Sequence, residues 1–439
     1  MADDERPAWV DYWSPGGAPA HLDPRFPPFN PNWKAAEHEA GIGFYCPWEE
    51  VYAGFPEHGR RLAVALRAQG IPLQLRSSRG GLQWQTTKDV SLARAYENMK
   101  RWLEPLLQAS IKRYKAEVWH VVSDDATFHR LATPAHPYLD PRELEHIYKR
   151  RIFSTVFERD RVSKDVAECL GRVGQIWVAN KKDWAMLVRS GVRHDKVHVV
   201  PIPYFPNDPH AALDGRARLP GPVRFYHIGK WEPRKDQHGI LGVFLRAFEP
   251  GECKLYMKTS AWGPKLKSGY PESPQESLSR WLTEPQVTAR GWTIDNIGRD
   301  VFLIQQRLPA ERLVALHRQA DVYVTLSRGE GFDMPAFDAK LAGNLMVYTP
   351  SGGPQSFAGR HDPCVEATGS IPADPFYGWH DACYLDYDGD AAVAAMRQAK
   401  LMVEKGLRVR GRDDFEAVFS AKVVGAQARA LVDELTEGP

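Results

Sequence analysis

From Gly41 onward, short apolar runs alternate with segments in which apolar residues recur every three or four positions. The short runs predict buried strands, and the periodic segments predict amphipathic helices. Strands that alternate with helices predict an α/β fold, in which helices cover both faces of a parallel sheet. The predicted strands are residues 41–46, 73–76, 118–122, 152–157, 176–179, 196–200, 224–228, 254–258 and 322–326.

The helices are predicted from apolar stripes that can face such a sheet. The clearest stripe follows the strand at residues 224–228, and a second lies just before Gly343, which can end a helix. The first stripe consists of Ile240, Leu241, Phe244, Leu245 and Phe248. The other predicted helices are residues 55–69, 93–114, 182–190, 334–342 and 415–435.

Three segments fall outside the alternation. Residues 1–40 are rich in Pro, Trp and Gly and show neither period, which predicts an irregular N-terminal extension. Prolines before Asn207 and within residues 208–221 predict a linker. Residues 259–292 form a polar insertion for which we predict no element. We therefore expect a first domain over residues 41–207, a second over residues 222–405 and a C-terminal helical segment over residues 406–439.

The composition is that of a globular protein, with 43% hydrophobic and 26% charged residues among 439, enough for two or three domains. The formal net charge of +2 provides no general attraction to nucleic acid or to acidic membranes. Basic clusters occur locally, and each is either a solvated face or a contact for phosphates or lipid headgroups. These clusters are Lys149-Arg150-Arg151, Lys181-Lys182 and residues 408–412.

The five cysteines are scattered and include no CxxC pair, which argues against a disulfide framework and against a zinc site. No apolar run approaches the ~20 residues that a membrane span needs. The first residues, Met-Ala-Asp-Asp-Glu-Arg, have the wrong charge for a secretory signal. We therefore expect a cytoplasmic protein whose only membrane contact would be peripheral.

Residues 326–353 place two carboxylates, Glu330 and Asp338, on either side of a junction between a loop and a helix. Small residues allow a tight loop, and Asp333 can cap the helix that follows. Backbone N–H groups at the helix N-terminus would then point toward an anion or a sugar hydroxyl. The alternative is a surface loop whose acids are merely solvated. The N–H groups concerned belong to Gly331, Phe332 and Asp333.

A second candidate site is the loop after the strand at residues 224–228. It begins at Gly229 and carries Lys230, Arg234 and Lys235. Because lysine supplies a point charge and arginine can bind oxygens in pairs, such a loop above a parallel sheet suits a diphosphate. Arg234 is the weaker candidate, since it can equally face solvent. The alternative for the whole loop is an ordinary basic turn.

Together with Ser351-Gly352-Gly353-Pro354, these motifs resemble those of the group-1 (family 4-like) retaining glycosyltransferases, which have the GT-B fold. Two glutamates stand eight positions apart in that family, and here the second is Asp338, one methylene shorter. The resemblance implies that Glu330 accepts hydrogen bonds from hydroxyls of the transferred sugar and Asp338 from those of a ribose. It also implies that Lys230 and Lys235 hold the donor diphosphate.

The resemblance extends from Gly41 to about Gly353 and implies two Rossmann-like domains that face a cleft. The first would hold the acceptor and the second the nucleotide-sugar donor, and the C-terminal helix would return to the first domain. Residues 1–40 would then either pack on the body or cover part of the acceptor cleft. The implied donor contacts are Gly54 beside the pyrophosphate, Lys258 near the nucleotide and the backbone at Ile304 facing the base, and His58 is a further candidate that can equally be structural.

Glu158 should emerge at the end of the strand at residues 152–157, at the sheet edge where open α/β folds bind ligands. Related enzymes often carry histidine at this position, facing the donor sugar. A carboxylate here can bind the sugar or the acceptor hydroxyl. An ion pair with Arg159 or Arg161 is the alternative.

The resemblance implies transfer of a hexose from a UDP- or GDP-sugar to an acceptor hydroxyl, with retention of anomeric configuration. We expect neither a cofactor nor a metal ion, because Ser123-Asp124-Asp125 and Asp388-Gly389-Asp390 are better explained as turns. The acceptor (small molecule, polysaccharide intermediate or modified nucleic acid) and the oligomeric state are not predicted. The alternatives are a GT-B epimerase or phosphorylase, a DNA-modifying relative and a catalytically weak carbohydrate-binding protein.

Overall fold

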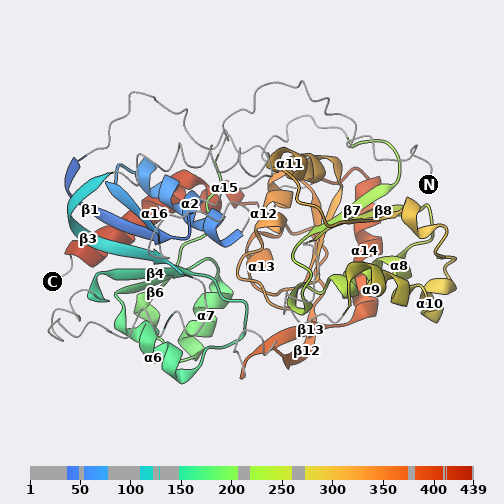
Figure 1. The fold of residues 1–439 in the computed structure, drawn as a ribbon, viewed down its shortest axis with the longest axis horizontal. Coiled ribbons are helices and arrows are strands. Elements are labelled where there is room, and N and C mark those ends of the chain that lie inside the picture. Colours follow the sequence, from blue (N-terminus) through green and yellow to red (C-terminus); the bar gives the residue numbers. More distant parts are fainter. Residues whose placement is uncertain are drawn as a thin grey trace.

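The computed structural model describes residues 37–48, 54–77, 109–121, 128, 148–205, 218–259, 272–373, 381–408, 411 and 413–437. Within them, two separate parallel sheets lie side by side, each flanked by helices, and a short antiparallel hairpin lies beside the second (Figure 1). This is the predicted α/β architecture of two Rossmann-like domains. Predictions for residues 1–36, 122–127 and 208–217 lie outside the described residues.

The first sheet has six strands in the order β2-β1-β3-β4-β5-β6, and every neighbouring pair is parallel. Its strands are β1 (Glu37–Cys46), β2 (Leu73–Ser77), β3 (Ser110–His120), β4 (Arg151–Thr155), β5 (Gln175–Val178) and β6 (Val197–Val199), and its helices are α2 (Gly54–Ala68), α6 (Lys164–Arg172) and α7 (Lys181–Arg189).

Two predictions for this sheet were wrong at element ends. The helix predicted over residues 93–114 does not include residues 110–114, which belong to β3 and pair with β1 through Ile111 and Tyr114. Residues 37–40, predicted to be irregular, are the first residues of β1. Both errors have one cause: the two ends pair with each other across 73 residues of sequence (Glu37↔Ser110), a contact that no local pattern reveals.

The second sheet has five parallel strands in the order β11-β10-β7-β8-β9. The strands are β7 (Val223–Ile228), β8 (Cys253–Lys258), β9 (Val301–Ile304), β10 (Val322–Thr325) and β11 (Leu345–Tyr348), and the hairpin is β12 (Ala367–Pro372) with β13 (Cys383–Tyr387). The helices are α8 (Gln237–Ala247), α9 (Pro274–Trp281), α10 (Pro285–Thr288), α11 (Ala310–Gln319), α12 (Met334–Leu341), α13 (Gly353–Phe357) and α14 (Gly389–Glu404), with one-turn helices η2 (His194–Lys196), η3 (Pro233–Lys235) and η4 (Ile297–Arg299).

The described part of the polar insertion, from residue 272, contains helices α9 and α10. Helix α9 begins with a capping box between Ser273 and Glu276. Its Trp281 lies against α8 at Gly242, where any Cβ would come within 2.1 Å of the indole ring. This part of the insertion is therefore packed structure that covers the second domain.

The C-terminal segment returns to the first domain as predicted (Figure 1). It forms two helices and not the single one predicted, α15 (Phe415–Phe419) and α16 (Ala421–Glu437), because Ser420 leaves the helix to pair with Tyr204. Helix α16 packs on α2 so closely that a Cβ on Gly425 would lie 2.6 Å from the Ala65 carbonyl oxygen. Among the described residues, no helix has the length and apolar character needed to cross a membrane.

Candidate active site

The strand orders locate the ligand-binding edge of each domain. In a doubly wound sheet, ligands bind at the C-terminal ends of strands where the strand order reverses. That point lies between β1 and β3 in the first sheet and between β7 and β10 in the second. The loops that follow β7 and β10 carry Lys235 and Glu330, so the two motifs recognised in the sequence meet at one switch point.

The loop after β7 begins at Gly229 because the buried His227 ring fills the space beside it. A Cβ on Gly229 would lie 2.5 Å from His227 Nε2. Gln237, at the start of α8, fixes the loop: its side-chain amide donates to the Lys230 carbonyl and accepts from the Glu232 N–H at 3.2 Å. Sequence reasoning missed this function of His227 and Gln237, because neither belongs to a charged pattern.

The two predicted lysines of this loop differ in environment. Lys230 is exposed, so its ammonium is accessible to a ligand. Lys235 is mostly buried, and its Nζ lies 2.5 Å from Glu330 Oε1 and 4.0 Å from Asp333 Oδ1. The structure thus brings together Lys235, Glu330 and Asp333, which were predicted from separate motifs.

Arg234 does not face solvent; its side chain is only 5% exposed. Its guanidinium lies within 2.6 Å of Glu232, 3.0 Å of Glu158 and 3.1 Å of Glu330. It also donates to the Gly329 carbonyl at 2.6 Å. Glu158 therefore has an ion-pair partner in the other domain that the sequence did not suggest. Arg161, one of the two partners that it did suggest, pairs with Asp160.

The loop after β10 needs glycines because the first domain lies directly against it. A Cβ on Gly329 would come within 2.3 Å of the Glu158 carbonyl oxygen, and one on Gly331 within 2.4 Å of Val156 Cβ. Asn180, the N-cap of α7, donates from its side-chain amide to the Gly331 carbonyl at 2.5 Å. The tight loop predicted from small residues is therefore an interface between the two domains.

Helix α12 begins where the sequence predicted. Asp333 occupies the predicted N-cap position with a left-handed backbone (φ 64°, ψ 73°), but its side chain forms no capping hydrogen bond with the helix. Its carboxylate accepts a hydrogen bond from the Thr325 hydroxyl at 2.7 Å instead. Phe332 lies beside Gly353, where a Cβ would meet the Phe332 carbonyl at 2.1 Å. The first N–H groups of a helix lack intrahelical partners, so the N-terminus of α12 can receive an anion or a hydroxyl.

The charges at this junction are strongly coupled. Burial alone would raise the pKa of Glu330, but Lys235 and Arg234 lower it to about 2. Burial raises the pKa of Asp333 to about 6 against the opposing effect of Lys235. Burial would lower the pKa of Lys235, but the carboxylates of Asp333 and Glu330 raise it. At neutral pH the junction therefore holds an ionised Glu330 against two cations.

Helix α2 of the first domain meets α12 near both of their N-termini. A Cβ on Gly54, the first residue of α2, would lie 3.4 Å from Met334 Cγ, the first residue of α12. About two turns into α2, Arg61 forms an ion pair with Asp338 at 3.1 Å and with Glu57 at 3.0 Å. Gly54 and Asp338 therefore belong to one junction between α2 and α12, and Arg61 is a residue of this junction that sequence reasoning missed.

The predicted nucleotide contacts lie along the same edge of the second sheet. Lys258 and Ile304 are register partners at the ends of β8 and β9, and the Gly229 N–H donates to the Lys258 carbonyl at 3.0 Å. The Lys258 ammonium itself donates to the Thr259 carbonyl at 2.7 Å. This edge continues directly from the Lys235 loop.

His58 is buried and not at an open surface, with 2% of the residue exposed. Its ring meets the His120 ring edge-on at 4.6 Å, and burial together with His120 lowers the pKa of His58 well below its ordinary value. His58 is therefore neutral and packs in the interior of the first domain. This agrees with the alternative that His58 has a structural role.

Asp388 caps α14 by accepting from the N–H groups of Asp390 and Ala391, as a turn residue does. The other acidic triplet, Ser123-Asp124-Asp125, lies outside the described residues. Within the described ranges, no group of three or more His, Cys, Asp or Glu side chains is arranged to hold a metal ion.

No protein-family model and no curated protein matches the sequence. The structure is similar to several solved glycosyltransferases. HepE of Anabaena, solved with UDP-glucose, matches with a TM-score of 0.51 and 12% identity over 90% of this chain and 99% of that one. AviGT4, a glycosyltransferase involved in avilamycin A biosynthesis, matches with a TM-score of 0.53 and 15% identity over 92% of this chain and 99% of that one.

The lipopolysaccharide outer core galactosyltransferase WaaB matches with a TM-score of 0.53 and 13% identity over 89% of this chain and 98% of that one. In each case the match spans nearly the whole of both chains, so it includes both Rossmann-like domains and their arrangement. The chain therefore has the GT-B fold, with two Rossmann-like domains.

Proposed function

We propose that the protein is a retaining glycosyltransferase that moves a hexose from a nucleotide-diphosphate sugar to an acceptor hydroxyl. The observation that carries this proposal is the junction of Lys235, Glu330 and the α12 N-terminus at the switch point of the second domain. A cation, a carboxylate and a helix N-terminus together suit a diphosphate joined to a sugar. The resemblance of the motifs and the UDP-glucose bound to HepE support the same interpretation.

In this proposal the donor diphosphate lies against Lys235 and the exposed Lys230. Its negative charge then takes over part of the ion pairing that Glu330 and Asp333 provide to Lys235 in the absence of a ligand. Glu330 then accepts hydrogen bonds from sugar hydroxyls. The bond from the sugar to the diphosphate breaks as the acceptor oxygen bonds to the same carbon, and the leaving diphosphate takes the proton of the acceptor hydroxyl. The two lysines and the α12 N-terminus stabilise the charge of the leaving diphosphate without a metal ion. The nucleotide extends along the β8–β9 edge toward Lys258 and Ile304.

Direct binding tests this proposal. Calorimetric titration of UDP- and GDP-hexoses should show one saturable site, whereas a free hexose or a nucleoside should bind far more weakly, because neither carries the diphosphate. A protein that binds free hexoses as tightly as any nucleotide sugar would be a carbohydrate-binding protein and would contradict the proposal.

A further inference from the structure

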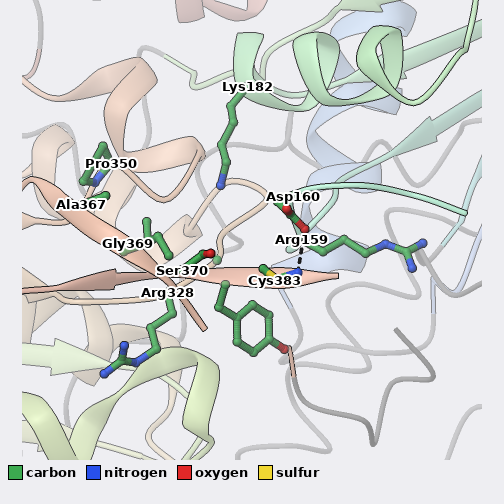
Figure 2. Close-up of a pocket in the computed structure, with 12 residues that line it drawn as sticks. Arg159, Asp160, Lys182, Arg328, Pro350, Ala367, Gly369, Ser370 and Cys383 are labelled. Carbon is green, nitrogen blue, oxygen red and sulfur yellow. Dashed lines mark hydrogen bonds between the residues drawn. The ribbon is translucent and has the colours of Figure 1, made fainter. Parts of the chain in front are cut away.

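A hollow lies between the domains, beside Gly329 of the loop that carries Glu330. It is a cavity of about 180 Å³ between α7 and the β12–β13 hairpin (Figure 2). Arg234 reaches the Gly329 carbonyl from the donor side, while Gly329 also lines the cavity. The residues that line it include Asp160 and Lys182 from the first domain and Arg328, Gly329, Ser370 and Cys383 from the second.

The cavity exists only where the two domains meet. Asp160 Oδ1 accepts a hydrogen bond from the Cys383 N–H at 2.7 Å, which joins the first domain to the hairpin. The other oxygen of Asp160 is engaged by Arg161 at 3.1 Å. Arg328 is engaged by Asp236 and Asp386. The charges of Asp160 and Arg328 are therefore already met within the protein.

Lys182 differs from these groups. Its side chain runs from α7 into the cavity (Figure 2), and among the described residues its ammonium donates one hydrogen bond, to the Ser351 carbonyl at 2.6 Å. An ammonium has three donors, so two can serve a ligand. Burial lowers the pKa of Lys182 but Asp183, Asp160 and Glu330 oppose this effect. Burying a cation is costly unless it is paired, which makes an anionic ligand favourable here.

The cavity adjoins the donor site through a single carbonyl. The Ser351 oxygen that accepts from Lys182 also accepts from the Glu330 N–H at 3.0 Å. At about 180 Å³ the cavity is smaller than the roughly 300 Å³ of ordinary ligand sites, so it suits one group of a larger molecule and not a nucleotide. Its cation, Lys182, comes from the first domain, to which the family resemblance assigns the acceptor, and this favours the acceptor over the donor.

We propose that this cavity binds an anionic group of the acceptor, a carboxylate or a phosphate monoester, through the Lys182 ammonium. The inference rests on the proposed glycosyltransferase function and adds the chemical class of the acceptor. Asp160 and Cys383 hold the hairpin against the first domain, so the subsite forms with the closed arrangement of the two domains. Gly329, which has no side chain, and Ser370, whose side chain is small, leave room for the anion.

The test compares sugars of the same shape and different charge. Protein saturated with UDP or GDP, whichever binds, is titrated with glucose, glucose 6-phosphate and glucuronate. We expect at least one anionic sugar to bind about ten- to a hundredfold more tightly than glucose, the size of one charge-assisted hydrogen bond. Tighter binding of glucose 6-phosphate would identify a phosphate group as the ligand, and tighter binding of glucuronate would identify a carboxylate. Equal affinities for all three sugars would overturn the proposal.

Substitutions at Lys182 and Ser370, each with a matched control, locate the binding. Lys182→Met should abolish the preference for the anionic sugar, Lys182→Arg should retain it, and Lys181→Met, on the exposed neighbour, should not change it. Ser370→Asp places a carboxylate in the cavity on an exposed strand and should also abolish the preference, whereas Thr368→Asp on the same strand should not. Unchanged preference in both Lys182→Met and Ser370→Asp would overturn the proposal. Failure of UDP and GDP to bind would instead refute the donor site, and the anion titration would still test the cavity.

Discussion

Lys235 is a buried cation whose charge is shared between two carboxylates of the other active-site loop, Glu330 at 2.5 Å and Asp333 at 4.0 Å. A donor diphosphate would become a third partner. This arrangement keeps the lysine charged in the absence of a ligand, since the two carboxylates raise its pKa against the effect of burial. The residue is thus prepared for an anion before the donor binds.

The first prediction follows from this environment. Lys235→Ala should raise the dissociation constant of the nucleotide sugar about ten- to a hundredfold, because each charge-assisted bond to a phosphate contributes roughly 1.5–3 kcal/mol. Calorimetry measures the effect, and Lys181→Ala on the exposed surface of α7 is the matched control. A donor affinity equal to that of the wild type would show that the diphosphate does not bind at this loop.

The second prediction concerns Glu330. Glu330→Gln and Glu330→Ala both remove the ion pairs with Lys235 and Arg234. The difference in kcat/KM between the two variants therefore measures the contribution of the side-chain carbonyl oxygen that glutamine keeps and that can accept a hydrogen bond. Loss of sugar positioning by about 1 Å can cost about a hundredfold, whereas one altered hydrogen bond costs about tenfold. We therefore expect the alanine variant to have the lower kcat/KM. NMR of the product should show retention; an inverted product, or a glycosyl adduct on Glu330, would contradict this role.

The third prediction is a pH dependence that arises from Asp333. Burial raises its pKa to about 6, so the carboxyl is neutral below that pH and charged above it. The charged form competes with a diphosphate for Lys235, and donor affinity should therefore fall, by up to about tenfold, as the pH rises from 5 to 7. Asp333→Asn should remove this dependence. An affinity that rises over the same interval would show that the ionised carboxylate assists the donor.

At the scale of elements, α2 and α12 come from different domains and are joined by the ion pair of Arg61 and Asp338 at 3.1 Å. Both side chains are largely removed from solvent, with 2% and 15% exposed. Such a pair couples the orientation of the two helices, because removal of either partner leaves a charge in a poorly solvated place. The ribose contact implied for Asp338 therefore depends on a residue of the first domain.

The fourth prediction tests this coupling by a double-mutant cycle. Arg61→Ala and Asp338→Ala should each weaken donor binding and lower stability, and the double variant should show a coupling energy of about 0.5–3 kcal/mol. Urea unfolding and calorimetry of the four proteins measure both effects. The pair Arg193 and Asp195, exposed at 72% and 47%, is a control for which little coupling is expected. Purely additive effects at Arg61 and Asp338 would contradict the coupling.

The elements that the sequence predicted well are those whose pattern is local. Strand β10, the loop after it and helix α12 follow from an apolar run, small residues and an aspartate at the N-cap position, which lie within twenty residues of one another. The aspartate marks the start of the helix, although its side chain forms no capping hydrogen bond. The contacts that it did not predict are between distant segments. Arg61 and Asp338 are 277 positions apart, and the buried state of Arg234 depends on Glu158 of the other domain. Residues 110–114 likewise become a strand because β1 lies beside them.

At the scale of the whole molecule, two doubly wound sheets place their switch points against each other. The contacts between the domains include two ion pairs, Arg61 with Asp338 and Glu158 with Arg234. They also include hydrogen bonds from side chains of the first domain to backbone carbonyls of the second, such as Asn180 to Gly331 and Lys182 to Ser351. Helix α16 then ties the chain end back onto α2.

The proposed chemistry uses the charge of the protein itself, with Lys230 and Lys235 beside the leaving diphosphate. The most direct test is release of UDP or GDP from a panel of nucleotide hexoses in the presence of EDTA, with and without glucose 6-phosphate, glucuronate or glucose as acceptor. We predict release of diphosphonucleotide from at least one donor, faster with acceptor, undiminished by EDTA and strongly reduced in Lys235→Ala. Release that stops with EDTA and returns with magnesium or manganese, or no release from any donor, would contradict the account.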